Sequence, residues 1–317
     1  MNTKRPRLNP TLIALLLAVV LFIIGGLVHP GFANYFLAIN ILRLASFLGI
    51  VAAGQTLVII SGGEGIDLSV GSVITLGAIL VYQISNGNNA MVLPALIIAL
   101  AVGAAIGAIN GLGITLLRIP PLVMTLGMAG VVQGLILVVT QGKLTGSTAP
   151  IMVSLISSPL VFAIPGVVLV WVILGAAMWA LLERTPYGKR LFAVGVNRTT
   201  AKLSGVRVPA VLVVTYALSG ILAALGGFVL LGYTQRVFLN LGSDYTLTSV
   251  AAVVVGGTIL AGGQGSYFGT MAGSLVLTIL TSLITTLLLP ESIREIVFGA
   301  MLLLLLSFYG RQRRLRN

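Results

Sequence analysis

The sequence of 317 residues contains no cysteine, a single histidine (His29) and only six acidic residues. Without cysteine the chain can form neither disulfides nor a thiolate metal site, and one histidine cannot build an imidazole cluster. We therefore expect no bound metal. The sequence also lacks a Gly-x-x-x-x-Gly-Lys-Ser/Thr phosphate loop and any catalytic dyad. We expect a protein that is not an enzyme, holds no cofactor and does not hydrolyse ATP itself.

Charge is scarce as well, at 8% of residues, whereas 58% are hydrophobic. A soluble domain cannot bury so much apolar surface, so the composition predicts an all-α polytopic membrane protein with one transmembrane domain over 1–317. A span needs about 20 apolar residues, and we expect about ten transmembrane helices, or eight if some segments are re-entrant. The expected spans are 11–28, 41–60, 67–85, 91–112, 119–141, 164–182, 210–232, 246–261, 265–289 and 292–309.

The basic residues that give the net charge of +12 are distributed unevenly between the two sides of the expected spans. Fourteen of the 18 basic residues fall on one side when the N-terminus is placed inside, which predicts that both termini are cytoplasmic. Because these residues lie at span ends and tails, we expect no nucleic-acid partner. The start of the chain resembles a signal peptide, but no clear cleavage site follows Val28, and we interpret 11–28 as an uncleaved first span.

The loop 183–209 carries six basic residues and one acid, which predicts a cytoplasmic position. Thr185 before Pro186 is typical of a helix start and Gly195 of its end, and Asn197 and Gly205 mark a second short helix. Two short helices outside the bilayer would suit contact with a soluble partner. A solvated basic loop without a partner is an equal alternative.

A glycine-rich stretch between two apolar runs includes Gly62 and Gly63, followed by Asp67 and Ser69. An acid and a serine suit the positive end of the helix that follows, so a capped turn at the membrane edge is one interpretation. An inner gate or a contact with a partner is the other. A similar stretch, 262–265, recurs late in the chain, either as part of an internal repeat or by chance.

Polar residues inside expected spans are candidates for lining a translocation pathway, and we select Gln55, Asn110 and Gln133. Such residues more often hydrogen-bond to neighbouring helices. All six acids fall in expected loops or span ends, which argues against a proton-driven carrier. The outer connection 143–165 is long, and we expect a short helix in it at the outer surface.

Four motifs, spread over about 40–308, resemble the permeases of ribose-type ABC importers. They are Gly54-Gln-Thr-Leu-Val-Ile-Ile with Gly65-Ile-Asp-Leu-Ser-Val-Gly-Ser72; Asn110-Gly111 with Arg118-Ile-Pro-Pro-Leu-Val-Met-Thr-Leu-Gly127; Thr185-Pro-Tyr-Gly-Lys-Arg-Leu-Phe-Ala-Val-Gly-Val-Asn197 with Leu203-Ser-Gly-Val206; and Ala251-Ala-Val-Val-Val-Gly-Gly-Thr258 with Gly262-Gly-Gln-Gly-Ser266. The family's usual Gly-Gly-Ile-Asp-Leu-Ser is interrupted here by Glu64 and Gly65.

The resemblance implies a multi-pass subunit of the bacterial cytoplasmic (inner) membrane, paired with a second copy or a paralogue. Two partner ATP-binding subunits would hold ATP and Mg, and an extracytoplasmic binding protein would deliver ribose, galactose, galactofuranose, xylose, inositol or the furanosyl autoinducer. The loop 183–209 would then couple to the ATPase. Its implied contact residues are Arg198, Thr199, Thr200, Ala201, Lys202, Leu203, Ser204 and Gly205.

On the outer side, Lys143 and Arg236 are candidates for docking the binding protein. The alternative to an importer subunit, from another class of transporter, is an ion-coupled or passive sugar carrier that needs no ATPase. The sequence does not identify the sugar.

Overall fold

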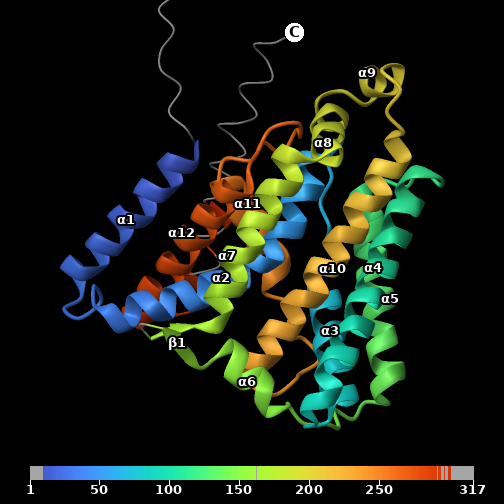
Figure 1. Cartoon of the computed structure of the whole chain (residues 1–317). Coiled ribbons are helices and arrows are strands. Elements are labelled where there is room, and N and C mark those ends of the chain that lie inside the picture. The colour runs from blue at the N-terminus through green and yellow to red at the C-terminus, as the bar shows by residue number, and fades with distance from the viewer. Residues whose placement is uncertain (1–9, 162, 291, 294–295, 297–298, 301–317) are drawn as a thin grey trace, which may run out of the picture.

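The computed structural model describes residues 10–161, 163–290, 292–293, 296 and 299–300. Figure 1 shows helices running between two ends of a bundle, with α8 and α9 at one end and α6 and β1 at the other. The long elements are α1 (Pro10–Val28), α2 (Tyr35–Ile60), α3 (Val70–Ser85), α4 (Val92–Thr115), α5 (Pro121–Thr140), α7 (Gly166–Trp179), α10 (Val208–Thr234), α11 (Tyr245–Val255) and α12 (Tyr267–Thr286).

Shorter elements connect them. They are η1 (Asn89–Met91), α6 (Pro150–Ile156), β1 (Pro159–Val161), β2 (Ile164–Pro165), the π-helical η2 (Ala180–Arg184), α8 (Pro186–Val196) and α9 (Arg198–Leu203). The strands form an antiparallel hairpin between α6 and α7. The expected helix within 143–165 is α6, whose Met152 and Ile156 are buried.

Seven helices of the described chain are long and apolar enough to cross a membrane, which agrees with a polytopic all-α protein. The expected spans 67–85 and 246–261 are shorter helices, α3 and α11. Glycines with left-handed backbone angles lie near both helices: Gly62 and Gly63 precede α3, and Gly257 comes just after α11 ends. The expected span 292–309 lies largely outside the described residues.

The centre of the bundle is the contact between α10 and α4, and α10 also packs against α3 and α2. The glycines of α4 make the first contact close. A Cβ atom on Gly103 would overlap the Gly220 carbonyl oxygen, and one on Gly107 would overlap that of Tyr216. Small residues let transmembrane helices approach to backbone contact, so this helix pair packs without intervening side chains.

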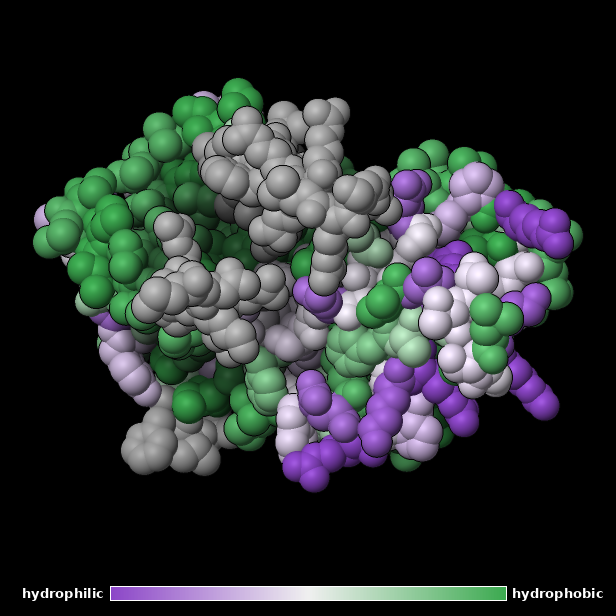
Figure 2. Space-filling view, turned by 90° about the horizontal axis from the view of Figure 1, so that it is seen from above, coloured by the Kyte–Doolittle hydropathy of each residue, from purple (hydrophilic) through white to green (hydrophobic). Residues whose placement is uncertain are grey.

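The outward faces of the bundle are apolar. Leu27, Leu93, Ile173 and Val138 are all more than half exposed, on α1, α4, α7 and α5. Figure 2, viewed from the α8–α9 end, shows hydrophobic residues over one flank and hydrophilic residues gathered on the other. Exposed aliphatic surface of this extent is what the hydrocarbon of a bilayer covers.

Candidate functional site

The loop 183–209 folds into α8 and α9, as its capping residues predict. The Thr185 hydroxyl accepts a hydrogen bond from the Gly188 amide at 3.2 Å, and the Asn197 side chain accepts one from the Thr200 amide at 3.0 Å. Each cap satisfies an amide that has no partner within its helix. Gly205, with a φ of +82°, follows the second helix. The prediction of two short helices is confirmed.

The α8–α9 loop presents charge and apolar surface together. Val196 is 72% exposed and Leu203 is 85% exposed, although both are aliphatic. Lys202, Ser204 and Gly205 are exposed too, as are Thr199 and Thr200, whereas Ala201 is buried against the bundle. Exposed aliphatic side chains among basic ones are typical of a surface that a partner covers.

Beneath this loop, three glycine-containing segments meet in what we call the glycine junction: 62–63 after α2, Gly195 in α8, and 262–263 before α12. The Gly263 amide donates to the Ile60 carbonyl at 2.9 Å. A Cβ on Gly195 would overlap that carbonyl oxygen, and one on Gly262 would overlap the Gly62 backbone. The two similar glycine-rich stretches are therefore in contact, and side chains larger than hydrogen are excluded between them.

Arg198 connects α9 to this junction. Its Nη2 donates to the Gly62 carbonyl at 2.9 Å, and its guanidinium lies over Gly63. The same carbonyl accepts the Gly65 amide at 3.3 Å, across a turn in which Glu64 adopts a φ of 60°. Glu64 and Gly65, the residues added to the family pattern, thus form the turn that Arg198 contacts. Among the described groups, none accepts from the buried Arg198 Nε.

Tyr187 attaches α8 to the bundle through a 2.9 Å hydrogen bond with the Thr215 hydroxyl of α10. Thr215 already donates to the Val211 carbonyl, so Tyr187 is the donor. Burial raises the pKa of Tyr187 to about 12. The phenol therefore stays protonated, and the bond persists, at every physiological pH.

The chain turns at 62–65 after α2, as its glycines predict, but Asp67 does not lie at that turn, which corrects its expected position at the membrane edge. Its carboxylate accepts from the Ser69 amide at 3.0 Å, the Ser69 hydroxyl at 2.6 Å and the Ser219 hydroxyl at 2.8 Å. Ser219 lies near the middle of α10, so Asp67 sits deep in the bundle and is 1% exposed. Residues 65–67 follow this turn without regular secondary structure and lead inward, so that Asp67 lies inside the bundle before α3 begins at Val70.

Two of the three predicted pathway residues belong to this buried cluster. Gln55 accepts from the Asp67 amide at 3.2 Å, and Asn110 donates to the Ser69 hydroxyl at 3.0 Å. The Asn110 carbonyl oxygen is buried without a partner in the described chain. Gln133 is not brought to them, because it is exposed on α5. The contacts of Gln55 and Asn110 are those of helix-bridging residues, and their pathway role stays a prediction.

Sequence reasoning did not select Ser219 or Thr125, which complete the cluster. Thr125 accepts from the Leu68 amide at 3.1 Å and so holds the segment that precedes α3 against α5. The only signal in the sequence for these two residues was a hydroxyl group within an apolar span, and many spans contain such a group. At the opposite end of the bundle, Lys143 and Arg236 are both exposed, just after α5 and α10.

These features define a multi-pass membrane protein with a structured basic loop at one end and backbone contacts leading from it into the bundle. The family described as branched-chain amino acid transport system / permease component matches residues 37–306. The chain therefore belongs to this family of ABC importer permeases.

Among curated proteins, the chain is 35% identical to the ribose import permease protein RbsC of Bacillus subtilis, over 90% of this chain and 88% of the relative. It is 34% identical to the autoinducer 2 import system permease protein LsrC of Yersinia enterocolitica, over 95% of this chain and 82% of the relative. It is 32% identical to the LsrC protein of an Escherichia coli strain, over 96% and 88%. No solved structure matches the chain.

Proposed function

We propose that this chain is the membrane subunit of an ATP-driven importer for a monosaccharide or similar polyol. The observation that carries the proposal is the glycine junction: the exposed α8–α9 loop is in backbone and Arg198 contact with the segments leading into α3 and α12. A force applied to α9 from outside the membrane therefore acts directly on elements inside it. The names of the RbsC and LsrC relatives support a sugar-like solute.

In this proposal the α8–α9 end faces the cytoplasm, and the segment Arg198–Gly205 contacts a partner ATPase that holds ATP and Mg. The membrane is the bacterial inner membrane, and a second copy or a paralogue completes the pathway. An extracytoplasmic binding protein docks at the opposite end, where Lys143 and Arg236 are exposed. Such rim charges raise the rate of docking more than its strength.

The test is uptake of labelled D-ribose, D-xylose, D-galactose and myo-inositol into proteoliposomes that hold this chain with its ATPase and binding protein. Uptake that requires both internal ATP and the binding protein is the expected result. Uptake by the chain alone, without ATP, would overturn the proposal.

A second candidate function is an ion-coupled carrier, and one observation favours it. Asp67 is an acid buried beside the middle of α10, without a cationic partner among the described residues. Intramembrane acids of this kind often bind protons or cations in carriers. Vesicles holding only this chain, given a proton or sodium gradient in place of ATP, would accumulate sugar if this function were correct.

A further inference from the structure

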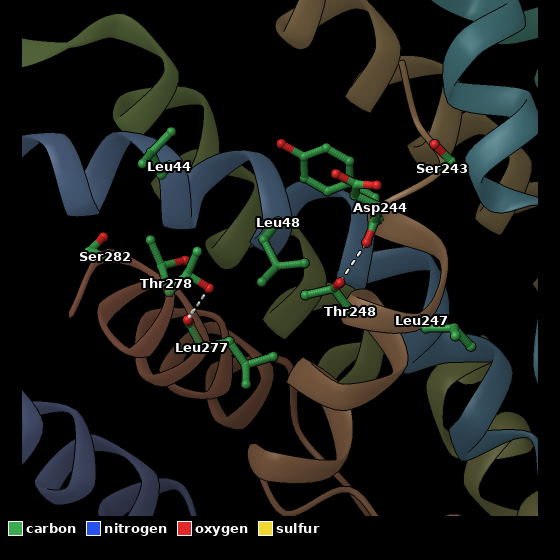
Figure 3. A pocket seen from close by; sticks show the side chains of 11 residues that line it. Leu44, Leu48, Ser243, Asp244, Leu247, Thr248, Leu277, Thr278 and Ser282 are labelled. Atoms are coloured by element: carbon green, nitrogen blue, oxygen red, sulfur yellow. Dashed lines mark hydrogen bonds between the residues drawn. The ribbon is translucent and has the colours of Figure 1, made fainter. Parts of the chain in front are cut away.

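A cavity of about 440 Å³ lies between α2, the start of α11 and α12, away from both the α8–α9 loop and the Asp67 cluster. Leu44 and Leu48 come from α2, and the other lining residues come from 243–248 and 277–282. Figure 3 shows the side chains of Asp244, Leu48 and Thr278 arranged around it. Seven of its eleven lining residues carry a hydroxyl or carboxyl group, in a bundle whose outer faces are aliphatic.

The hydrogen-bonding groups of the cavity divide into two kinds. Those of Ser243, Thr248 and Thr281 donate to backbone carbonyls at 2.6, 2.5 and 2.9 Å, which leaves their oxygens as acceptors. Within the described chain, no hydrogen bond is made by the carboxylate of Asp244 or by the hydroxyls of Tyr245, Thr278 and Ser282. The cavity therefore offers unused donors and an unused anionic acceptor.

The apolar part of the lining completes the match to one chemical class. Leu44, Leu48 and Leu277 provide aliphatic surface among the polar groups. A sugar has the same division, because its hydroxyls both donate and accept while its C–H groups are apolar. Pockets typically combine an apolar wall with a few polar groups that fix orientation.

The charge of the lining disfavours anionic solutes. Asp244 is the one charged residue among the residues that line the cavity, and no lysine or arginine is among them. A phosphate ester, or the carboxylate of an amino acid, would meet a negative charge without a positive partner there. Hydroxyl groups, by contrast, donate strong hydrogen bonds to a carboxylate.

We propose that this cavity is a binding site for a neutral polyhydroxylated solute of monosaccharide size, with Asp244 accepting from its hydroxyls and Thr278 contributing a further hydrogen bond. The proposal rests on the proposed function, because it gives the solute a place within the permease. The proposal also places solute contact at the start of α11 and along α12, away from the packing contact between α4 and α10 at the centre of the bundle.

The first experiment uses the absence of cysteine from the chain. A Thr281→Cys substitution places a single thiol in the cavity, and its reaction with a methanethiosulfonate reagent is timed in the assembled complex. D-ribose, D-xylose, D-galactose and myo-inositol are tested as protecting probes, with L-leucine as the solute that should not protect. Thr285→Cys is the matched control, because Thr285 lies one turn further along α12, is exposed and does not line the cavity.

We expect at least one of the sugars to slow labelling of Thr281→Cys several-fold and to leave Thr285→Cys unchanged. No protection by any of the four would overturn the site. If assembly of the complex blocks the labelling of Thr281→Cys without any sugar, the cavity is a contact between subunits. That result would also overturn the proposed site.

The second experiment measures transport. Both Asp244→Asn and Thr278→Val keep the side-chain shape. The first removes the negative charge and one acceptor oxygen, the second removes the hydroxyl, and we expect each to lower uptake at subsaturating sugar about tenfold. Thr285→Val should leave uptake unchanged. Wild-type rates in both cavity variants would overturn the site even if the importer function holds. Sugar protection of Thr281→Cys without ATP-dependent uptake would instead retain the site and reject the importer.

Discussion

Replacing Arg198 by alanine tests the link between the α8–α9 loop and the interior of the bundle. The substitution removes the 2.9 Å hydrogen bond from Arg198 Nη2 to the Gly62 carbonyl and uncovers Gly63. A hydrogen bond from a charged donor contributes about 1.5–3 kcal/mol. Because Arg198 is only partly buried, we take the lower end, about 1.5 kcal/mol, which corresponds to roughly a tenfold change in an equilibrium constant.

The quantity to measure is the number of sugar molecules taken up per ATP hydrolysed in proteoliposomes. We expect Arg198→Ala to lower this ratio about tenfold while ATP hydrolysis continues, because the loop still meets the ATPase but holds the α2–α3 segment less firmly. Arg198→Lys should give an intermediate ratio, since lysine keeps the charge but lacks the planar guanidinium that covers Gly63.

The matched control is Lys189→Ala, which removes a basic residue of the same loop that is exposed on α8. Its ratio should equal that of the wild type. An equal loss in both alanine variants would show that the loop acts through its overall charge and not through the Gly62 contact. A wild-type ratio in Arg198→Ala would refute the reasoning outright.

Three further predictions concern stability and packing. Gly195→Ala places a methyl group against the Ile60 carbonyl, and we expect it to destabilise the protein by about 1–3 kcal/mol and to reduce uptake, measured by thermal unfolding and transport. Ser219→Ala leaves the buried carboxylate of Asp67 with one donor fewer and should cost about 1.5–3 kcal/mol in thermal unfolding. Ser46→Ala, which removes a buried hydroxyl bonded only within its own helix, should cost clearly less, and equal losses would contradict the assigned role of Ser219. Tyr187→Phe should destabilise the protein by about 1 kcal/mol below pH 10. Because folding raises the pKa of Tyr187 from 10.0 to about 12, the wild type loses stability over that interval and the difference should shrink; a difference independent of pH would contradict the assignment.

The sequence predicted best the local features, such as helix caps, that depend on residues close together in the chain. Thr185 and Asn197 were expected to cap two short helices, and they do, because a cap is a contact within three residues. It predicted less well what depends on tertiary position. Asp67 has the local pattern of a helix cap, yet its second carboxylate oxygen bonds to Ser219, which is 152 residues away.

The same distinction explains the helix limits and the pathway residues. α2 begins at Tyr35 instead of residue 41, because Asn34 accepts from the Leu37 amide and starts the helix early. Gln133 and Asn110 look alike in sequence, but only one faces the interior, and periodicity is uninformative where both faces of a helix are apolar. The cavity beside Asp244 was not predicted, since its walls come from three segments distant in the chain.

The glycine junction has a mechanical consequence. Its segments are in backbone contact, so pushing α8 toward the bundle displaces the other two segments at once, as solid bodies in contact do. Among the described residues, two hydrogen bonds hold them together, from Gly263 to Ile60 and from Arg198 to Gly62. The junction is therefore stiff in compression and weak in tension. We therefore expect a push on the α8–α9 loop to move the segments before α3 and α12, and a pull on the loop to move them less.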